Sequence, residues 1–121
     1  MSNCITSSEL RDLGNSMILD SNKRIETIPS DLNAPFHSEA RQLESDLLAI
    51  YRLIVLIVRK EQDLDVIAEA WSGMVELCDT FGLALNDLAK KHPDCGADSY
   101  YDRVLDLRNK CNHLKILHKQ K

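Results

Sequence analysis

The sequence has few of the residues that build phosphate-binding loops. Only four glycines and three prolines occur among 121 residues, and aromatic residues make up 5% of the chain. A loop that cradles a phosphate needs glycines close together so that backbone N–H groups can approach the ligand. The scarcity of glycine therefore argues against a nucleotide-binding protein of that kind.

Membrane-length and basic segments are also absent. The longest apolar run, Leu47–Val58, is too short to span a bilayer, which needs about 20 apolar residues, and Arg52 interrupts it. The start of the chain lacks the basic, apolar and small-residue order of a secretory signal. A net charge of −4 gives no electrostatic reason to expect nucleic acid or an anionic membrane as a partner. We therefore expect an ordinary soluble protein without a membrane partner.

The four cysteines contain no CxxC pair. Cys78 and Cys111 fall on apolar positions of predicted helices, where a free cysteine acts as a small hydrophobic residue. Cys4 and Cys95 lie outside such positions, and we expect them to be the accessible thiols. This usage predicts a reducing, cytoplasmic setting.

The chain is organised around the apolar run Leu47–Val58, which lies inside a longer helical pattern. Apolar residues recur at alternating steps of four and three, the period of a helix that buries one seam. The seam consists of Phe36, Ala40, Leu43, Leu47, Ile50, Ile54 and Ile57. Six branched residues, 53–58, are also compatible with a buried strand, but the length of the pattern favours a helix. Because apolar residues extend beyond the seam, we expect this helix to be the most enclosed one.

Similar patterns predict four helices, at residues 7–28, 35–60, 64–91 and 99–118, joined by short connections. Their expected starts are Thr6 with Glu9 as a capping box, Asn33 followed by Pro35, Asp63, and Asp98 or Ser99. Seams in heptad register with short connections are typical of helix bundles. The prediction is a single all-α domain over residues 1–121, an antiparallel up-and-down four-helix bundle.

The third predicted helix has the clearest seam and the first has the weakest. Trp71 and Phe81 lie on the seam of the third helix, so both should be buried. Gly73 and Gly82 each cost roughly 1 kcal/mol in a helix relative to alanine. Gly82 adjoins the seam, which suggests that a neighbouring backbone or the Phe81 ring needs the space. The apolar side of the first helix is diluted by Gly14, Ser21 and Arg24, and we expect this helix to fray most readily.

Histidine and cysteine spacings offer one metal site on paper. His92-x-x-Cys95 and Cys111-x-His113 supply four possible zinc ligands, but zinc needs them convergent and tetrahedral. Residues two apart in a helix point roughly 200° away from each other, so Cys111 and His113 cannot chelate together. No histidine has a glutamate three residues earlier, as di-iron helical bundles require. We expect no metal and no cofactor.

One stretch near the end of the chain contains residues suited to acid–base chemistry. Arg108 is followed directly by Asn109 and, five residues after the arginine, by His113. This Arg-Asn-x-x-x-His stretch resembles the signature of the HEPN superfamily, small helical domains that often dimerise and include metal-independent ribonucleases and toxins. The resemblance implies that Arg108 and His113 act on the scissile phosphate of RNA, with Asn109 as the polar neighbour of the arginine. Arg108 and His113 differ by roughly 140° in direction on an undistorted helix, so the function needs them to meet at one phosphate, for instance across a dimer.

The second predicted helix carries two features outside its seam. Three arginines, Arg41, Arg52 and Arg59, share another face. Such a stripe can bind an anion, but we expect these arginines to be solvated or paired with acids. Four apolar residues also lie outside the seam: Leu48, Leu53, Val55 and Leu56. Large exposed apolar patches usually mark interfaces. The leading hypothesis is therefore a non-enzymatic bundle that acts through protein contacts, as a homo-oligomer such as a dimer or with a helical protein partner. The alternative is a HEPN-like domain that cleaves or binds RNA.

Overall fold

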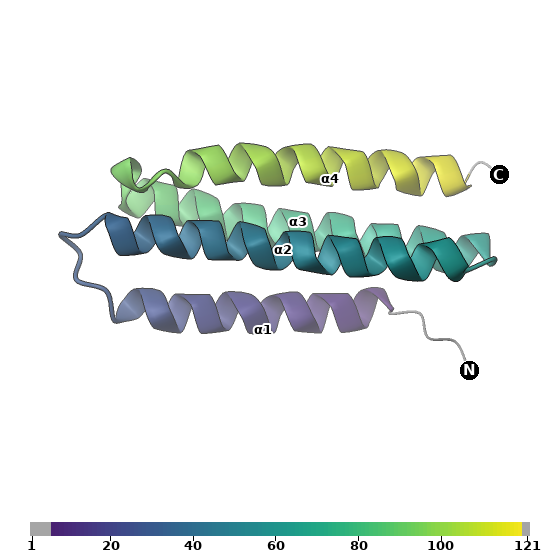
Figure 1. Ribbon diagram of the computed structural model, residues 1–121, viewed down its shortest axis with the longest axis horizontal. Helices are drawn as coiled ribbons and strands as arrows, with labels where there is room; N and C mark the ends of the chain where they lie inside the picture. The colour runs from purple at the N-terminus through teal and green to yellow at the C-terminus, as the bar shows by residue number, and fades with distance from the viewer. Residues whose placement is uncertain (1–5, 120–121) are drawn as a thin grey trace.

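The computed structural model describes residues 6–119, which form four long α-helices and one turn of 3₁₀ helix (Figure 1). The helices are α1 (Ser7–Glu26), α2 (Ala34–Lys60), α3 (Leu64–Lys91) and α4 (Ala97–Lys119), and the 3₁₀ turn η1 (Pro93–Cys95) precedes α4. This part of the chain contains no strand, and residues 53–58 are helical. Successive helices run in opposite directions (Figure 1). The predicted all-α antiparallel four-helix bundle is confirmed.

The central helix of the bundle is α3, which contacts each of the other three helices. In Figure 1, α1 and α4 flank it on opposite sides and α2 lies in front of it. Fourteen of the 28 residues of α3 are buried, compared with six of the 27 residues of α2. The expectation that α2 is the most enclosed helix is therefore wrong. The reason is steric, because α3 carries buried small residues on several faces: Ala68, Ala70, Gly73, Gly82 and Ala89.

The seams predicted for α2 and α3 supply most of the core. The α2 seam is buried from Phe36 to Ile54. Trp71 and Phe81 of α3 are 3% and 0% exposed, which confirms their predicted burial. The Trp71 ring lies beside Tyr51 of α2, with 5.9 Å between the ring centroids. The interface between α2 and α3 thus forms the middle of the molecule.

Two glycines let α1 pack closely against α3. A Cβ atom on Gly14 of α1 would lie 1.9 Å from Cδ2 of Leu77, so Leu77 fills the space that the missing side chain leaves. On the facing helix, a Cβ atom on Gly73 would lie 2.7 Å from Cδ1 of Leu10. Each glycine therefore receives a leucine of the other helix. Gly14, which dilutes the apolar pattern of α1, therefore makes room for a side chain of α3.

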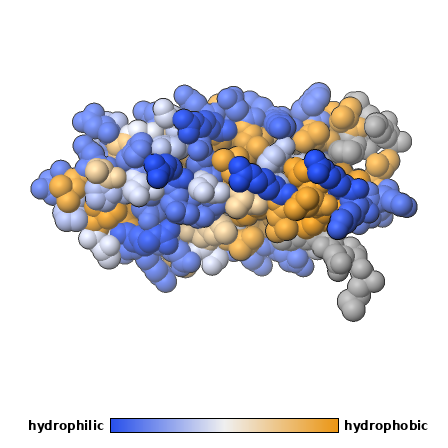
Figure 2. All heavy atoms as spheres, in the orientation of Figure 1, coloured by the Kyte–Doolittle hydropathy of each residue, from blue (hydrophilic) through white to orange (hydrophobic). Residues whose placement is uncertain are grey.

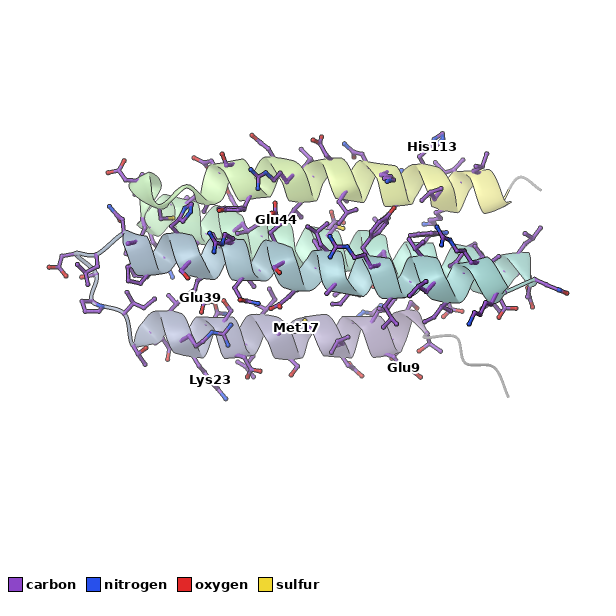
Figure 3. The ribbon with its side chains drawn as sticks, viewed as in Figure 1. Glu9, Met17, Lys23, Glu39, Glu44 and His113 are labelled. Carbon is purple, nitrogen blue, oxygen red and sulfur yellow. The ribbon has the colours of Figure 1, made fainter. Side chains whose placement is uncertain are left out.

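A polar contact attaches α1 to α2. Arg24 and Ser21 of α1 both donate hydrogen bonds to the carboxylate of Glu39, whose side chain is only 11% exposed. Figure 3 shows Glu39 on the side of α2 that faces α1. The hydrogen bond with Glu39 raises the pKa of Arg24 above its ordinary value. Because Ser21 is buried, its hydroxyl needs this partner, and the contact fixes the position of α1 along α2.

Two of the predicted N-terminal caps, those of α1 and α3, are present. The Thr6 hydroxyl accepts from the N–H of Glu9 (3.1 Å), and the Asp63 carboxylate accepts from the N–H of Asp65 (3.0 Å). Asn33 precedes α2 but forms no side-chain cap. Its backbone has φ −97° and ψ −28°, in the helical region, whereas a capping side chain needs an extended backbone. The expected Asn33 cap is therefore wrong.

Two helix boundaries differ from the expected ones. The first helix ends at Glu26, two residues early, because the N–H of Ile28 bonds three residues back and closes a tight turn. The last helix begins at Ala97, directly after η1 and Gly96. The expected caps of that helix, Asp98 and Ser99, consequently lie inside its first turn.

A polar cluster fixes the connection between α3 and α4 against α2. The Nδ1–H of His37 donates to the carbonyl of Cys95 (2.9 Å), and Nε2 of His37 accepts from the Tyr100 hydroxyl (3.2 Å). Gly96 has φ 81°, and a Cβ atom there would lie 2.9 Å from Nδ1 of His37, so both conformation and space require glycine. This turn buries Cys95, and the expectation of an accessible Cys95 thiol is wrong. Cys4, the other expected accessible thiol, lies outside the described residues.

Candidate interaction surfaces

A groove of about 250 Å³ lies between α3 and α4. Its lining, which defines the α3–α4 groove, includes Asp79, Leu83 and Asn86 of α3 and Tyr101, Leu105 and Arg108 of α4. The Nε of Arg108 donates to Oδ1 of Asp79 (3.1 Å), which links the two helices. Leu83 and Leu105 are 66% and 42% exposed. The groove is therefore an open depression with apolar edges and one ion pair.

Beneath this groove, Cys78 of α3 meets Cys111 of α4. Both side chains are buried and neither forms a disulfide. Hydrogen bonding with Cys111, together with burial, raises the pKa of the Cys78 thiol. The thiolate is the nucleophilic form of cysteine, so Cys78 is suited to packing rather than to reaction. The predicted burial of Cys78 and Cys111 as small hydrophobic residues is confirmed.

The residues of the Arg-Asn-x-x-x-His stretch lie in different surroundings. The side chain of Arg108 is 34% exposed and is held in the α3–α4 groove by Asp79. Asn109 and His113 are exposed and do not line that groove. Figure 3 shows His113 on the outer side of α4, directed away from the other helices. Within one chain, the structure does not bring His113 and Arg108 to a common cleft.

The side of α2 that faces away from the core forms a second surface, which we term the α2 outer face. It consists of six exposed residues: Ala49, Arg52, Leu53, Leu56, Arg59 and Lys60. Leu53 and Leu56 are 47% and 56% exposed. Of the other two apolar residues predicted outside the seam, Val55 packs against the core and Leu48 is half-buried. Figure 2 shows apolar and strongly hydrophilic residues side by side on this side of the molecule.

The basic residues of the α2 outer face have no acidic partner in the described part of the chain. Four other arginines each bind a carboxylate of a neighbouring helix: Arg11, Arg24, Arg103 and Arg108. Arg52, Arg59 and Lys60 of this face take part in no ion pair within residues 6–119, and neither does Arg41, nearer the start of α2. The three arginines were expected to be either solvated or paired with acids, and the structure shows them solvated. The α2 outer face therefore combines exposed leucines with unpaired positive charge.

Sequence reasoning did not identify the α3–α4 groove. The available signal was that Leu83 and Leu105 lie outside the heptad seams of their helices, as Leu53 and Leu56 do in α2. Periodicity shows that such a residue is off the seam, but it does not show whether a neighbouring helix covers it. That depends on how α3 and α4 pack around Gly82, which only the three-dimensional arrangement reveals.

Residues 6–119 hold no group of three or more histidine, cysteine, aspartate or glutamate side chains placed to bind a metal ion. Among the helices of this range, none has the length and apolar content that crossing a membrane requires. Compared with known proteins, the chain matches no family model, no curated protein and no solved structure.

Proposed function

We propose that the protein acts by binding another protein chain through the α2 outer face, as a homo-oligomer or with a helical partner. The observation that carries this proposal is the exposure of Leu53 and Leu56, adjacent on one helix. Removing apolar surface from water contributes roughly 25 cal/mol per Å². A partner that covers both leucines would remove this apolar surface from water, and the complex would be stabilised accordingly.

The charges around the two leucines support the same function. Arg52, Arg59 and Lys60 adjoin them, which gives an apolar centre with a polar rim, the usual anatomy of a protein interface. Arginine is enriched at such interfaces, and unpaired cations favour encounter with an acidic surface. The partner is therefore expected to present apolar and acidic side chains together.

Sedimentation velocity of the purified protein tests the proposal. The wild type should show an associated species in the micromolar range, and Leu53→Glu/Leu56→Glu should lose it. Glutamate has nearly the helix propensity of leucine, so the variant should keep its helix content. The matched control is Leu19→Glu on α1, because Leu19 and Leu56 are each 56% exposed. This control should associate like the wild type.

A second measurement covers the case of a partner other than the protein itself. A photo-crosslinking amino acid at position 56 should form a defined product in an extract of the native cells, whereas the same group at position 19 should not. Absence of both self-association and a position-specific product would contradict the proposal.

A reducing, cytoplasmic compartment is part of the same proposal. It is supported by Cys78, Cys95 and Cys111, which are all free thiols in the structure. Alkylation of the protein under denaturing conditions, directly on extraction from its native cells, should modify all three. A disulfide involving any of them would contradict this compartment.

The alternative proposal is a HEPN-like domain that binds or cleaves RNA through Arg108, Asn109 and His113. One observation favours it, since Asn109 and His113 are exposed on α4 and so accessible to a ligand. Arg108, in contrast, is already engaged by Asp79 in the α3–α4 groove. In this alternative, a second chain would have to bring a further His113 to that groove.

Incubation with single-stranded RNA in the presence of a chelator separates the two proposals, because the HEPN-like chemistry uses only side chains. A positioned proton-transfer group typically contributes 10²–10⁴-fold in rate, so His113→Ala should nearly abolish any such cleavage. The exposure of His113 predicts a change of less than about 0.5 kcal/mol in unfolding free energy for the same variant. We expect no cleavage by the wild type. Cleavage that both His113→Ala and Arg108→Ala remove would overturn this expectation.

A further inference from the structure

We propose that the chain bound by the α2 outer face is a second copy of this protein, and that the face docks into the α3–α4 groove of that copy. This inference rests on the proposed function and names the partner. Each copy carries both surfaces, so the contact is heterologous: one surface of a copy binds a different surface of the next.

Carboxylates flank Leu83 at the α3 edge of the groove, whereas the α2 outer face has none: Asp79 lines the groove, and Asp87 lies just outside it, on the side toward α1. Asp79 and Asp87 are exposed and lie four residues before and after the exposed Leu83. Arg108 is the only cation among the described groove residues, and it bonds to Oδ1 of Asp79. A carboxylate has a second oxygen that can accept from another cation. An arginine from outside the molecule can therefore share Asp79.

Two carboxylates also lie near the α4 edge of the groove, although neither of them lines it. Asp98 and Asp102 are exposed and precede Leu105 by seven and three residues, or about two turns and one turn. The two aspartates therefore lie on the same side of α4 as the exposed leucine. Both surfaces thus present two exposed leucines, with cations around one pair and carboxylates around the other.

A symmetric contact between two α2 outer faces fits these charges poorly. Antiparallel packing around Leu53 and Leu56 would place Arg52 and Arg59 of both copies along one seam. No residue of the α2 outer face is acidic, so that seam would contain only positive charge. Juxtaposed like charges oppose association, whereas complementary charges favour it. The α3–α4 groove is therefore the better partner for this face.

The spacing of charges also matches across the two surfaces. Arg52 and Arg59 are seven residues apart with a leucine between them, which is about 10 Å along the helix at 1.5 Å per residue. Asp79 and Asp87 are eight residues apart with a leucine between them, or about 12 Å. The charges on the two helices therefore have similar separations along the helix axes.

The two surfaces lie on different sides of the molecule. Arg103 of α4 binds Glu44 of α2, so this side of α4 faces α2, whereas Tyr101, Leu105 and Arg108 line the groove on the α3 side. A copy whose groove is occupied therefore keeps its α2 outer face free for another neighbour. Repetition of such a contact produces either a closed ring or an open chain of copies.

Two blocked variants test the inference. Leu53→Glu/Leu56→Glu blocks the α2 outer face and leaves the groove intact, and Leu83→Lys/Leu105→Lys blocks the groove and leaves the face intact. All four positions are exposed, so circular dichroism should show unchanged helix content. Each variant alone should sediment as a monomer. An equimolar mixture should form a dimer and nothing larger, because each copy supplies one working surface, while the wild type should form larger species.

Three results would overturn the inference, and they separate it from the proposed function. A dimer of the groove-blocked variant alone would show that two α2 outer faces bind each other, which supports the function but not this contact. Self-association of the α2-blocked variant alone would place the contact elsewhere and contradict both. A monomeric wild type would exclude a second copy as partner and leave the function to the crosslinking measurement.

Charge reversal provides an independent pair of variants that keeps all the leucines. Arg52→Glu/Arg59→Glu and Asp87→Lys/Asp102→Lys should each weaken self-association by at least about tenfold, since each leaves like charges facing one another. A chain carrying all four substitutions should associate again, because the charges are then complementary in the opposite sense. Raising the salt concentration should weaken the wild-type association. Failure of the combined variant to recover would count against the proposed pairing of these surfaces.

Discussion

Two helices of similar length and the same heptad period, α2 and α3, occupy very different environments. The more apolar run belongs to α2, yet α2 buries a single stripe and leaves two leucines exposed. Half of α3 is buried, although both helices contact all the others. The distance between packed helices depends on the side chains at their contact. A helix with small residues on several faces can therefore bury more of its residues against its neighbours than one with large residues on every face.

The largest expected effect is a difference in unfolding free energy between a truncation in the seam of α3 and one on the outer face of α2. Phe81→Ala should reduce the free energy of unfolding by about 3–5 kcal/mol, because it leaves a cavity at a fully buried position. Leu56→Ala, also a truncation of a large apolar residue, should change it by less than about 0.5 kcal/mol. Urea unfolding followed by circular dichroism measures both. Similar losses for the two variants would show that α2 is enclosed in solution.

A smaller effect on stability is expected at two glycines, with opposite signs. It tests whether the space available beside α3 limits how closely the other helices pack against it. Gly14→Ala should destabilise by about 1 kcal/mol, because overpacking against Leu77 exceeds the gain in helix propensity. Gly82→Ala should stabilise by up to about 1 kcal/mol, since its new Cβ would lie 3.4 Å from the Tyr101 ring, an ordinary contact. Thermal unfolding of the two variants gives the comparison. Destabilisation by Gly82→Ala would mean that α3 and α4 lie closer together than described.

The smallest effect concerns exposed leucines on the two helices. Leu53→Ala on α2 and Leu83→Ala on α3 should each change the unfolding free energy by less than about 0.5 kcal/mol, measured at a concentration where the protein is monomeric. The outer side of α3 should then behave like that of α2, although their buried sides differ. A loss above 1 kcal/mol at position 83 alone would show that the α3–α4 groove closes around this side chain.

Much of the fold was predictable because helix period and capping chemistry are local. The buried seams of α2 and α3 and the caps at Thr6 and Asp63 follow from residue spacing alone. Asn33 failed as a cap because its backbone conformation is set by the preceding turn. Cys95 was expected to be exposed because its burial depends on a contact between the η1 turn and α2, far apart in the sequence. Local patterns contain no information on such contacts.

The candidate surfaces were predictable to a similar extent. The helical period placed Arg108 beside the seam of the last helix and His113 on another face, as the structure shows. It also identified Leu53 and Leu56 as lying outside the α2 seam. It did not reveal the α3–α4 groove, because a groove is a property of two helices and of the separation between them.

The attachment of α1 affects the order in which the helices open by local unfolding. Three residues of α1 are buried, and two of them, Gly14 and Ser21, are small, so Leu10 is its one large side chain in the buried core, whereas α2 and α3 each contribute several. Proteins open locally in cooperative units whose free energies follow the apolar contacts that each unit makes. We therefore expect α2, α3 and α4 to behave as an inner unit and α1 to open first. Amide hydrogen exchange would record the two as separate classes, fast in α1 and slow in α3.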